Sequence, residues 1–232
     1  MTPRAMGRLY APDDRDRLYP MSTVLPSTTL RRKTWWQEGW WGDQGADPHC
    51  VAFALAHWLA DGPRPVSIFA RSRPGVNTRE LYCAAQKLDP WPGDCDDHQY
   101  DGTSVRAGVQ ALQAWGHVRE YRWCYSADEV ARTVLTTGPV IMGTLWYEGM
   151  SRPNAAGVMT RTGDVQGGHA YVVNGVNLDD GLFRIKNSWG RAWGQRGHAF
   201  IRLADLDALI VSYGDACVPI QQLPAPLIET VH

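Results

Sequence analysis

A cysteine at the expected start of a helix is the residue of this chain best placed for nucleophilic chemistry. Before Cys50, Asp47 is a candidate N-cap and Pro48 suits the first helical position. From Cys50 to Leu59 nothing breaks a helix, and apolar residues recur at the spacing of one buried face. The positive end of the helix dipole would favour a thiolate. A buried cysteine acting as a small hydrophobic residue is the alternative, and this stretch alone does not choose between the two.

A histidine and an asparagine farther along the chain could complete such a site. His169 follows two glycines, which let another backbone approach closely, and it enters an apolar strand pattern. Asn187 ends a second strand pattern and opens the block Asn-Ser-Trp-Gly. An imidazole can exchange a proton with a thiol and needs an acceptor that fixes its tautomer. Taken singly, each residue is more often structural. A histidine at a strand start is usually a surface or capped residue, and asparagine suits turns.

Together, these segments resemble the papain-like cysteine peptidases. A glutamine, a cysteine, a histidine and an asparagine follow one another in the family's order, as Gln44, Cys50, His169 and Asn187. The resemblance runs from about residue 35 to about residue 203, and its most specific part is the 187–190 block with Trp-Gly three residues behind it. We therefore expect a papain-like cysteine peptidase without a signal peptide or a long propeptide.

The resemblance implies a role for each of these residues. Cys50 would be the nucleophile, held as a thiolate by His169, which would also protonate the leaving amine. Asn187 would orient the imidazole, and Trp189 would shield their hydrogen bond from water. The side-chain amide of Gln44 and the backbone N–H of Cys50 would form the oxyanion hole.

The family grips the substrate backbone with a pair of glycines on the helical lobe. The corresponding stretch here, residues 101–104, holds a single glycine, Gly102. We expect Gly102, Gly168 and Trp189 to contact substrate, with subsites near Gly102 shaped differently from those of relatives. His49 would face solvent or perturb the thiolate, and His57 and His117 are interpreted as helix-surface residues.

The order of patterns predicts an α+β fold with two lobes. Capping signals at Asn77 with Glu80, at Ser104, and at Ser126 with Glu129 predict helices that follow the cysteine helix. Strand patterns then cover residues 140–146, 169–176, 182–187 and 198–203. The resemblance implies a helical lobe facing an antiparallel, barrel-like lobe across a cleft. We divide the chain into a strap (1–33), a helical lobe (34–125) and a β-rich lobe (126–232) that form one catalytic unit.

The strap and the cysteines carry expectations about control and location. Residues 1–33 have no room for the family's long inhibitory propeptide, so we do not expect a conventional zymogen. Secreted relatives carry a bridged cysteine where this chain has Asp47, and the N-terminus lacks an apolar signal region. We therefore expect no disulfides and a cytoplasmic location, although export by another route would leave no mark in the sequence.

Composition excludes several other classes of function. Of 232 residues, 44% are apolar and 20% charged, and the formal net charge is −1. These values fit a globular protein and carry no basic field for nucleic acid or an anionic membrane. No apolar run is long enough to cross a bilayer. No metal-ligand spacing is recognisable, the acidic stretch 94–98 is interpreted as a solvated loop, and no cofactor is expected.

The sequence therefore predicts a thiol hydrolase that cleaves peptide bonds of a peptide or protein substrate. Two alternatives stay open. One is a peptide-binding or regulatory module that keeps the fold without turnover, and the other is a transpeptidase that passes the acyl group to an amine. Substrate preference and oligomeric state are not written in the sequence.

Overall fold

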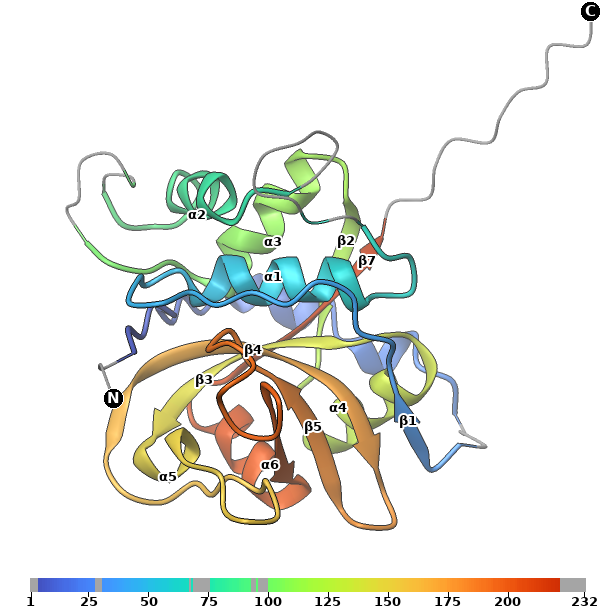
Figure 1. The fold of residues 1–232 in the computed structure, drawn as a ribbon. Helices are drawn as coiled ribbons and strands as arrows, with labels where there is room; N and C mark the ends of the chain where they lie inside the picture. The colour runs from blue at the N-terminus through green and yellow to red at the C-terminus, as the bar shows by residue number, and fades with distance from the viewer. Residues whose placement is uncertain are drawn as a thin grey trace, which may run out of the picture.

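The computed structural model describes residues 4–27, 31–66, 68, 76–92, 95 and 100–221. Helices cover both faces of one antiparallel sheet, with α1, α2 and α3 on one side and α4 and α6 on the other (Figure 1). The helices run α1 Cys50–Asp61, α2 Thr78–Gln86, α3 Val105–Ala114, α4 Ala127–Thr136, α5 Glu148–Ser151 and α6 Leu203–Val211. Two short 3-10 helices, Asp14–Leu18 and Met21–Thr23, belong to the N-terminal strap.

Three of the predicted helix starts are confirmed by their capping bonds. The side chain of Asn77 accepts from the backbone N–H groups of Arg79 and Glu80 at the start of α2. Ser104 and Ser126 cap α3 and α4 in the same way. A helix N-terminus leaves several N–H groups without intrahelical partners, and these side chains satisfy some of them.

The predicted start of α1 is wrong. The helix begins at Cys50 itself with His49 as N-cap, and none of the described side chains caps it. Asp47 is not free to cap because it lies in a turn, where its backbone N–H donates to the Gln44 carbonyl and its own carbonyl accepts from the Gln44 side chain. Cys50 therefore occupies the first residue of the helix, as the chemistry requires.

The sheet is open rather than barrel-like. Its strands are β1 Lys33–Trp35, β2 Val118–Trp123, β3 Val140–Tyr147, β4 Val165–Asn177, β5 Leu182–Lys186, β6 His198–Arg202 and β7 Asp215–Gln221. They pair in the order β2-β7-β3-β4-β5-β6, with β1 on the long strand β4, so that β2 and β6 end the sheet instead of meeting. The four predicted strands correspond to β3, β4, β5 and β6.

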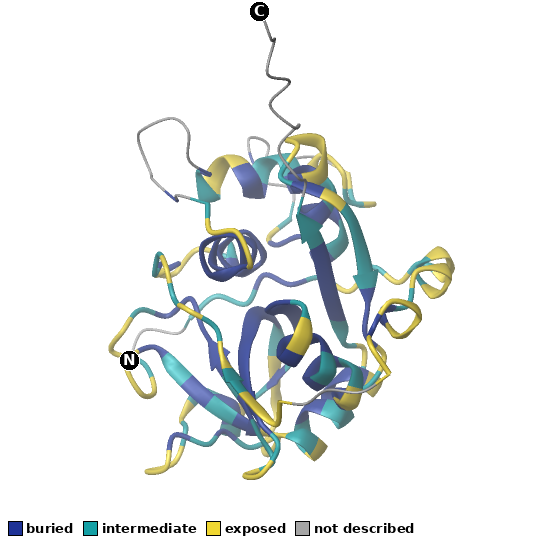
Figure 2. Cartoon of the chain, turned by 90° about the vertical axis from the view of Figure 1, so that its right-hand side faces the viewer, coloured by how far each residue is buried: buried dark blue, intermediate teal, exposed yellow. Residues whose placement is uncertain are grey.

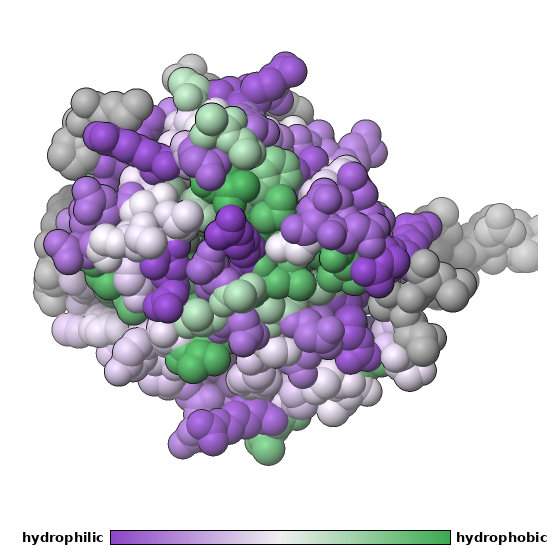
Figure 3. All heavy atoms as spheres, turned by 90° about the horizontal axis from the view of Figure 1, so that it is seen from below, coloured by the Kyte–Doolittle hydropathy of each residue, from purple (hydrophilic) through white to green (hydrophobic). Residues whose placement is uncertain are grey.

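Side chains of the central strands alternate between two cores, as the two-residue period of a strand requires. On β3, Ile141 packs in the core under α1, while Val140 and Met142 pack in the core with α4 and α6. On β4, Val172 and Val173 divide in the same way. Figure 2 shows the resulting band of buried residues between the helices and the sheet. The face seen in Figure 3 mixes hydrophilic and hydrophobic residues.

Cys83 of α2 and Cys95 form a disulfide, so the expectation of no disulfides is wrong. Cys50, Cys124 and Cys217 are free and buried. Because this disulfide is present, the argument that all thiols are reduced does not hold. That argument partly supported the expected cytoplasmic location. The other residues of the acidic stretch, 94 and 96–98, lie outside the described residues. Among the helices that the structure describes, none combines the length and apolar character needed to span a bilayer. The division of the chain at residues 33 and 125 stays a prediction.

Candidate active site

The N-terminus of α1 meets β4 at the point where the predicted nucleophile and base lie. Cys50 and His169 are both fully buried, and the backbone N–H of Ala170, the residue after His169, lies against the Cys50 sulfur. Asn187 follows β5, the neighbour of β4 in the sheet. Its side-chain oxygen lies 2.8 Å from Nε2 of His169. The fold thus brings Cys50 to the strand region that holds two residues more than a hundred positions farther along the chain.

The hydrogen bonds around Asn187 define the tautomer of His169. The Asn187 Oδ1 atom also accepts from the backbone N–H of Ser188 at 2.8 Å, which identifies it as the oxygen. His169 Nε2 must then donate, so in the neutral ring Nδ1 carries a free lone pair. Among the described residues this buried Nδ1 has no hydrogen-bond partner. The ring of His169 therefore has a free lone pair on Nδ1, and the structure records no hydrogen bond between this atom and the Cys50 thiol.

Aromatic rings enclose the histidine. The Trp189 ring lies 5.0 Å from the His169 ring between centroids, and the Trp146 ring lies 4.7 Å away at a steep angle. Trp146 is fully buried and Trp189 nearly so. The two indoles pack on each other and on Trp193, which excludes water from the His169–Asn187 bond. Trp146 is a site residue that the sequence left without a role.

Gln44 is held in place by the residue that follows Asn187. Its side-chain oxygen accepts from the Ser188 hydroxyl at 2.6 Å, and its backbone N–H donates to the Ser188 carbonyl at 2.8 Å. The amide nitrogen donates to the carbonyl oxygens of Asp47 at 2.8 Å and Ala5 at 3.1 Å. The predicted oxyanion-hole amide therefore already donates to a peptide carbonyl from elsewhere in the chain.

The carbonyl of Ala5 belongs to residues 4–9, here called the cleft segment. These residues run between the helical layer and β4. Gly7 lies against Pro48, next to the active-site helix, and its carbonyl accepts from the backbone N–H of Thr103 at 2.9 Å. Leu9 donates to the Thr103 carbonyl at 2.9 Å, and Arg8 donates to the Gly168 carbonyl at 3.0 Å. The cleft segment is thus bonded to both walls of the cleft.

The predicted substrate-binding glycines face this segment. A Cβ atom on Gly102 would lie 2.4 Å from the Gly7 carbonyl oxygen, and one on Gly168 would lie 2.1 Å from the Arg8 carbonyl oxygen. Both glycines are needed for this close approach of a backbone. No conventional zymogen was expected, and the structure places part of the strap, at Gly7, against the Cys50 sulfur.

Burial of Cys50 and His169 reverses the expected ionisation of the site. Burial raises the pKa of the Cys50 thiol to about 11, although backbone N–H groups of Ala170 and Gly7 act in the opposite sense. Burial lowers the pKa of His169 to about 4, against the raising effect of its bond to Asn187. With the segment in place both groups are neutral, so the predicted thiolate–imidazolium pair does not form in this state.

Two other histidines lie differently from their sequence interpretation. His57 is fully buried in α1 rather than on its surface, and its Nε2 accepts from the backbone N–H of Gly42 at 3.0 Å. His49 is half-buried, with its ring 4.0 Å from that of Tyr82 between centroids. Burial lowers the pKa of both histidines. Neither contacts the Cys50 sulfur through a hydrogen bond that the structure records, so neither acts directly on the thiol.

A buried ion pair behind the site connects α1 to β5. Lys186, the residue before Asn187, lies 2.6 Å from Oδ1 of Asp61 at the end of α1, and both side chains are completely buried. Asp61 also accepts from the Gly39 backbone and the Asn174 side chain. This pair fixes the helix that carries Cys50 relative to the strand that leads to Asn187. Its two members lie far apart in the sequence, which gave no sign that they would meet.

Known proteins of similar sequence and fold are cysteine proteases. The model of the "Papain family cysteine protease" family matches residues 68–210, more than half of the chain, a range that includes His169 and Asn187 and begins after Cys50. "Cathepsin B-like cysteine proteinase 3" of Ostertagia ostertagi is 26% identical over 123 residues, which cover 50% of this chain and 71% of the relative. "Cathepsin L 1" of Paramecium tetraurelia is 30% identical over 117 residues, 49% of this chain and 34% of the relative.

Solved structures show the same fold over nearly the whole chain. Xylellain, a cysteine protease from Xylella fastidiosa, superposes with a TM-score of 0.67 at 18% identity and covers 95% of this chain and 98% of its own. Digestive procathepsin L 3 of Tenebrio molitor larval midgut superposes with a TM-score of 0.61 at 16% identity over 94% of this chain and 76% of its own. The chain therefore belongs to the papain family of cysteine proteases, the cysteine peptidase class that its sequence predicts.

Proposed function

We propose that this protein hydrolyses peptide bonds by a Cys50–His169–Asn187 mechanism. The observation that carries the proposal is the bond between His169 Nε2 and Asn187 Oδ1, which leaves Nδ1 with a free lone pair and, among the described residues, no hydrogen-bond partner. The next residue, Ala170, lies against the Cys50 sulfur with its backbone N–H. A thiolate attacks a carbonyl far more readily than a thiol does. Membership of the papain family and the geometry of the three residues support this role.

The proposed reaction has two stages. Cys50 gives its proton to His169 Nδ1, and the sulfur attacks the carbonyl carbon of the scissile bond. His169 then gives the proton to the departing amine, which breaks the C–N bond and leaves a thioester on Cys50. A water molecule, deprotonated by His169, attacks the thioester, releases the acid product and restores the thiol.

Gln44 is the proposed side-chain donor of the oxyanion hole. Its amide nitrogen donates to the carbonyl oxygen of Ala5 at 3.1 Å within the cleft, and its bond to Ser188 keeps this nitrogen pointed there. A preorganised donor stabilises the charge that develops on the carbonyl oxygen. The backbone N–H of Cys50, at the N-terminus of α1, is the proposed second donor.

A substrate can reach Cys50 only after the cleft segment has left. The segment uses the donors and acceptors of Thr103 and Gly168 that an extended peptide would use, and its Gly7 backbone contacts the completely buried thiol. We therefore propose that the closed arrangement is a latent form. The contacts of residues 4–9 support this, in place of the expectation that no segment controls the enzyme.

Labelling with an epoxide or vinyl-sulfone peptide probe tests the proposal. We expect the adduct on Cys50 and turnover of a peptide library, with both lost in Cys50→Ala and with labelling kept in a matched Cys124→Ala control. Labelling at Cys124 or Cys217 alone would contradict the mechanism. Labelling of Cys50 without turnover would favour the binding-module alternative, and product masses increased by an added amine would favour the transpeptidase.

A further inference from the structure

His57 lies on the face of α1 that packs against the loop before Cys50. This loop, residues 39–44, leads to Gln44 and is here called the oxyanion loop. His57 follows Cys50 by about two helical turns, and its side chain is fully buried. Its Nε2 atom accepts from the backbone N–H of Gly42 at 3.0 Å, two residues before Gln44. The helix that carries the thiol thus also binds the loop that carries the proposed oxyanion-hole donor.

The oxyanion loop packs tightly against α1 around this bond. A Cβ atom on Gly42 would lie 2.2 Å from the Trp40 ring and 2.6 Å from the Phe53 ring, so the loop backbone lies directly on these two side chains. The His57 ring lies 5.3 Å from that of Trp40 and 6.2 Å from that of Trp41 between centroids. Phe53 and His57 are one turn apart in the helix, so both face the loop from the same side of α1. These contacts leave the loop little freedom to move around Gly42.

Other groups hold the two ends of the oxyanion loop. At its start, the backbone N–H of Gly39 donates to the Asp61 carboxylate at 2.9 Å. At its end, the backbone N–H of Gln44 donates to the Ser188 carbonyl at 2.8 Å. Between these ends, the bond to His57 anchors the residue two positions before Gln44. Its loss would therefore change the path of the backbone that leads to the Gln44 amide.

The surroundings of His57 fix its protonation. A backbone N–H only donates, so Nε2 must accept, and the proton of the neutral ring lies on Nδ1. Burial, together with the charges of Lys186 and His198, lowers the pKa of His57 well below its ordinary value, so the ring stays neutral. The buried Nδ1 has no hydrogen-bond partner among the described residues. Because a buried N–H without an acceptor costs free energy that an apolar side chain would not, the bond to the loop explains a histidine here better than packing does.

We propose that His57 is a positioning residue of the oxyanion hole. The inference rests on the proposed function, in which the Gln44 amide binds the oxyanion. By accepting from Gly42, His57 holds the loop so that this amide is oriented before the reaction begins. A donor that is already oriented stabilises the developing charge without reorganisation. His57 acts through Gly42 and Gln44 rather than on the substrate, so its loss weakens oxyanion stabilisation and leaves the reactivity of the thiol unchanged.

Two probes of Cys50 separate these two effects. A peptide aldehyde adds the Cys50 sulfur at its carbonyl carbon, and its oxygen then lies where the oxyanion forms, so its association constant depends on the oxyanion hole. 2,2′-Dipyridyl disulfide exchanges with the same thiol without a carbonyl, so its rate depends only on the access and reactivity of the thiol. Mass mapping of the mixed disulfide assigns this rate to Cys50. Both probes need the open form, so the ratio of the association constant to the exchange rate cancels the fraction of open protein.

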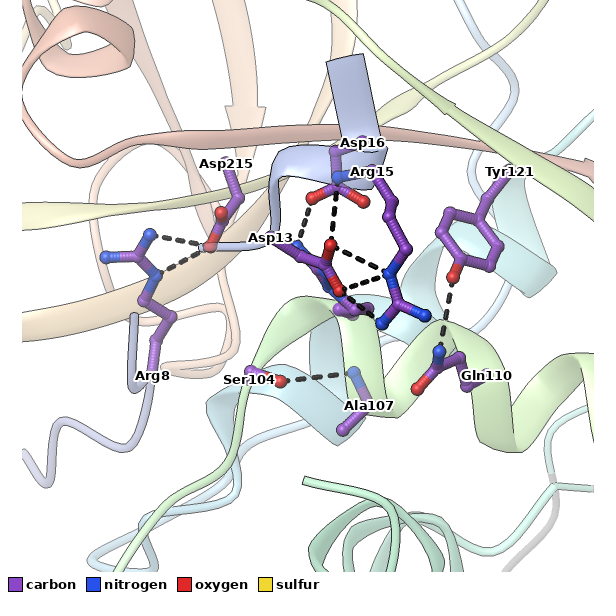
Figure 4. A network of polar contacts seen from close by, with 10 residues as sticks. Arg8, Asp13, Arg15, Asp16, Ser104, Ala107, Gln110, Tyr121 and Asp215 are labelled. Atoms are coloured by element: carbon purple, nitrogen blue, oxygen red, sulfur yellow. Dashed lines mark hydrogen bonds and ion pairs between the residues drawn. The ribbon is translucent and has the colours of Figure 1, made fainter. Parts of the chain in front are cut away.

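His57→Leu fills the buried space but cannot accept from Gly42, so it should lower this ratio by about tenfold. His57→Gln offers a side-chain oxygen in place of Nε2 and should restore the ratio to within about threefold of the wild-type value. In a Gln44→Ala background, His57→Leu should lower the ratio no further, since both changes act on one interaction. The control Gln110→Leu removes a side-chain bond from α3 to Tyr121 (Figure 4) and should leave the ratio unchanged.

A measurement on the wild-type protein keeps the test independent of how the variants fold. The ¹⁵N chemical shifts of the His57 ring should identify the tautomer protonated at Nδ1, and a proton on Nε2 would overturn the bond to Gly42. An unchanged ratio in His57→Leu, while Gln44→Ala lowers it, would overturn the role of His57 and leave the peptidase intact. An unchanged ratio in Gln44→Ala would instead overturn the proposed oxyanion donor, and a Cys50 that reacts with neither probe would overturn the peptidase.

Discussion

The ring of His169 shows how one hydrogen bond decides what a residue can do. Asn187 accepts from Nε2 and so leaves the lone pair of Nδ1 free. The same oxygen accepts from the Ser188 backbone, which holds the amide in one orientation. Without this acceptor the ring could rotate or adopt the other tautomer, in which Nδ1 carries the proton and cannot act as a base.

Replacing Asn187 by alanine should lower kcat/KM by about tenfold or more, since a neutral hydrogen bond contributes ~0.5–1.5 kcal/mol and the ring also loses its fixed orientation. Asn187→Asp keeps an acceptor and should retain more activity than Asn187→Ala. Steady-state hydrolysis of a peptide substrate measures both. An alanine variant as active as the wild-type enzyme would show that the acceptor is dispensable.

At the scale of elements, the cleft segment fits because of small residues at its closest contacts. A Cβ on Gly7 would lie 1.8 Å from the carbonyl oxygen of Pro48, which is backbone and cannot rotate away. Gly7 belongs to the segment rather than to the cleft wall. A substitution there changes how the segment binds and leaves the substrate's side of the cleft unaltered.

Gly7→Ala should therefore expel the segment and accelerate labelling of Cys50 by about tenfold or more, since overpacking costs about 1–3 kcal/mol. The rate of probe labelling under pseudo-first-order conditions is the measurement. Ser22→Ala, an exposed change in the same strap outside the cleft, serves as the control and should leave the rate unchanged. An unchanged rate in Gly7→Ala would mean that the segment does not limit access.

The Lys186–Asp61 pair sets the position of α1 on the sheet. Lys186→Met leaves Asp61 as a buried charge without its cation and should lower the free energy of unfolding by about 3–5 kcal/mol. Lys33→Met, at an exposed site on β1, should cost much less. Urea unfolding followed by tryptophan fluorescence measures both. Equal losses in the two variants would argue that burial of the pair adds nothing.

For the whole molecule, the sequence predicted what local patterns and motifs encode. The capping signals of α2, α3 and α4 and the four strand patterns depend on sequence neighbours, and the fold agrees with them, whereas the capping signal at Asp47 was wrong. α6 and β7 were not predicted, because residues 203–221 show an apolar pattern without a clear period and a proline at 219. The prediction of a barrel-like lobe was wrong, because the order of strands at the edges of a sheet depends on residues that lie far apart in the sequence.

The missed parts of the site share one cause. Arg8 and Asp215, Lys186 and Asp61, and the Cys83–Cys95 bridge are pairings between segments that no local pattern relates. The closed cleft was missed for the same reason, since residues 4–9 carry no helix or strand period. The predicted thiolate–imidazolium pair was wrong for this closed state, because the pKa of a thiol depends on whether water reaches the sulfur.

Acid should open the closed form. Burial holds the pKa of His169 at about 4 in the closed form, against an ordinary value of 6.5. When the segment leaves and water enters, the pKa rises toward the ordinary value, so the open form binds more protons below pH 6.5. The closed form is thus favoured above that pH and loses its advantage as pH falls toward 4. Burial raises the pKa of Asp215 above its ordinary value despite the opposing effect of Arg8, so solvation of this carboxyl in the open form acts in the opposite direction and weakens the dependence on pH.

If the open form has the ordinary value, the ratio of open to closed protein should rise by about twentyfold from pH 7 to pH 5. The methyl group of Met6, whose side chain packs against Gly167 in the closed form, reports this ratio in ¹³C-methionine NMR of the Cys50→Ala chain. His169→Gln in the same background cannot take up the proton and should show a much weaker dependence. A Met6 signal that stays in its closed position at pH 5 would mean that His169 remains sealed from water, and that another group or a protease must release the segment.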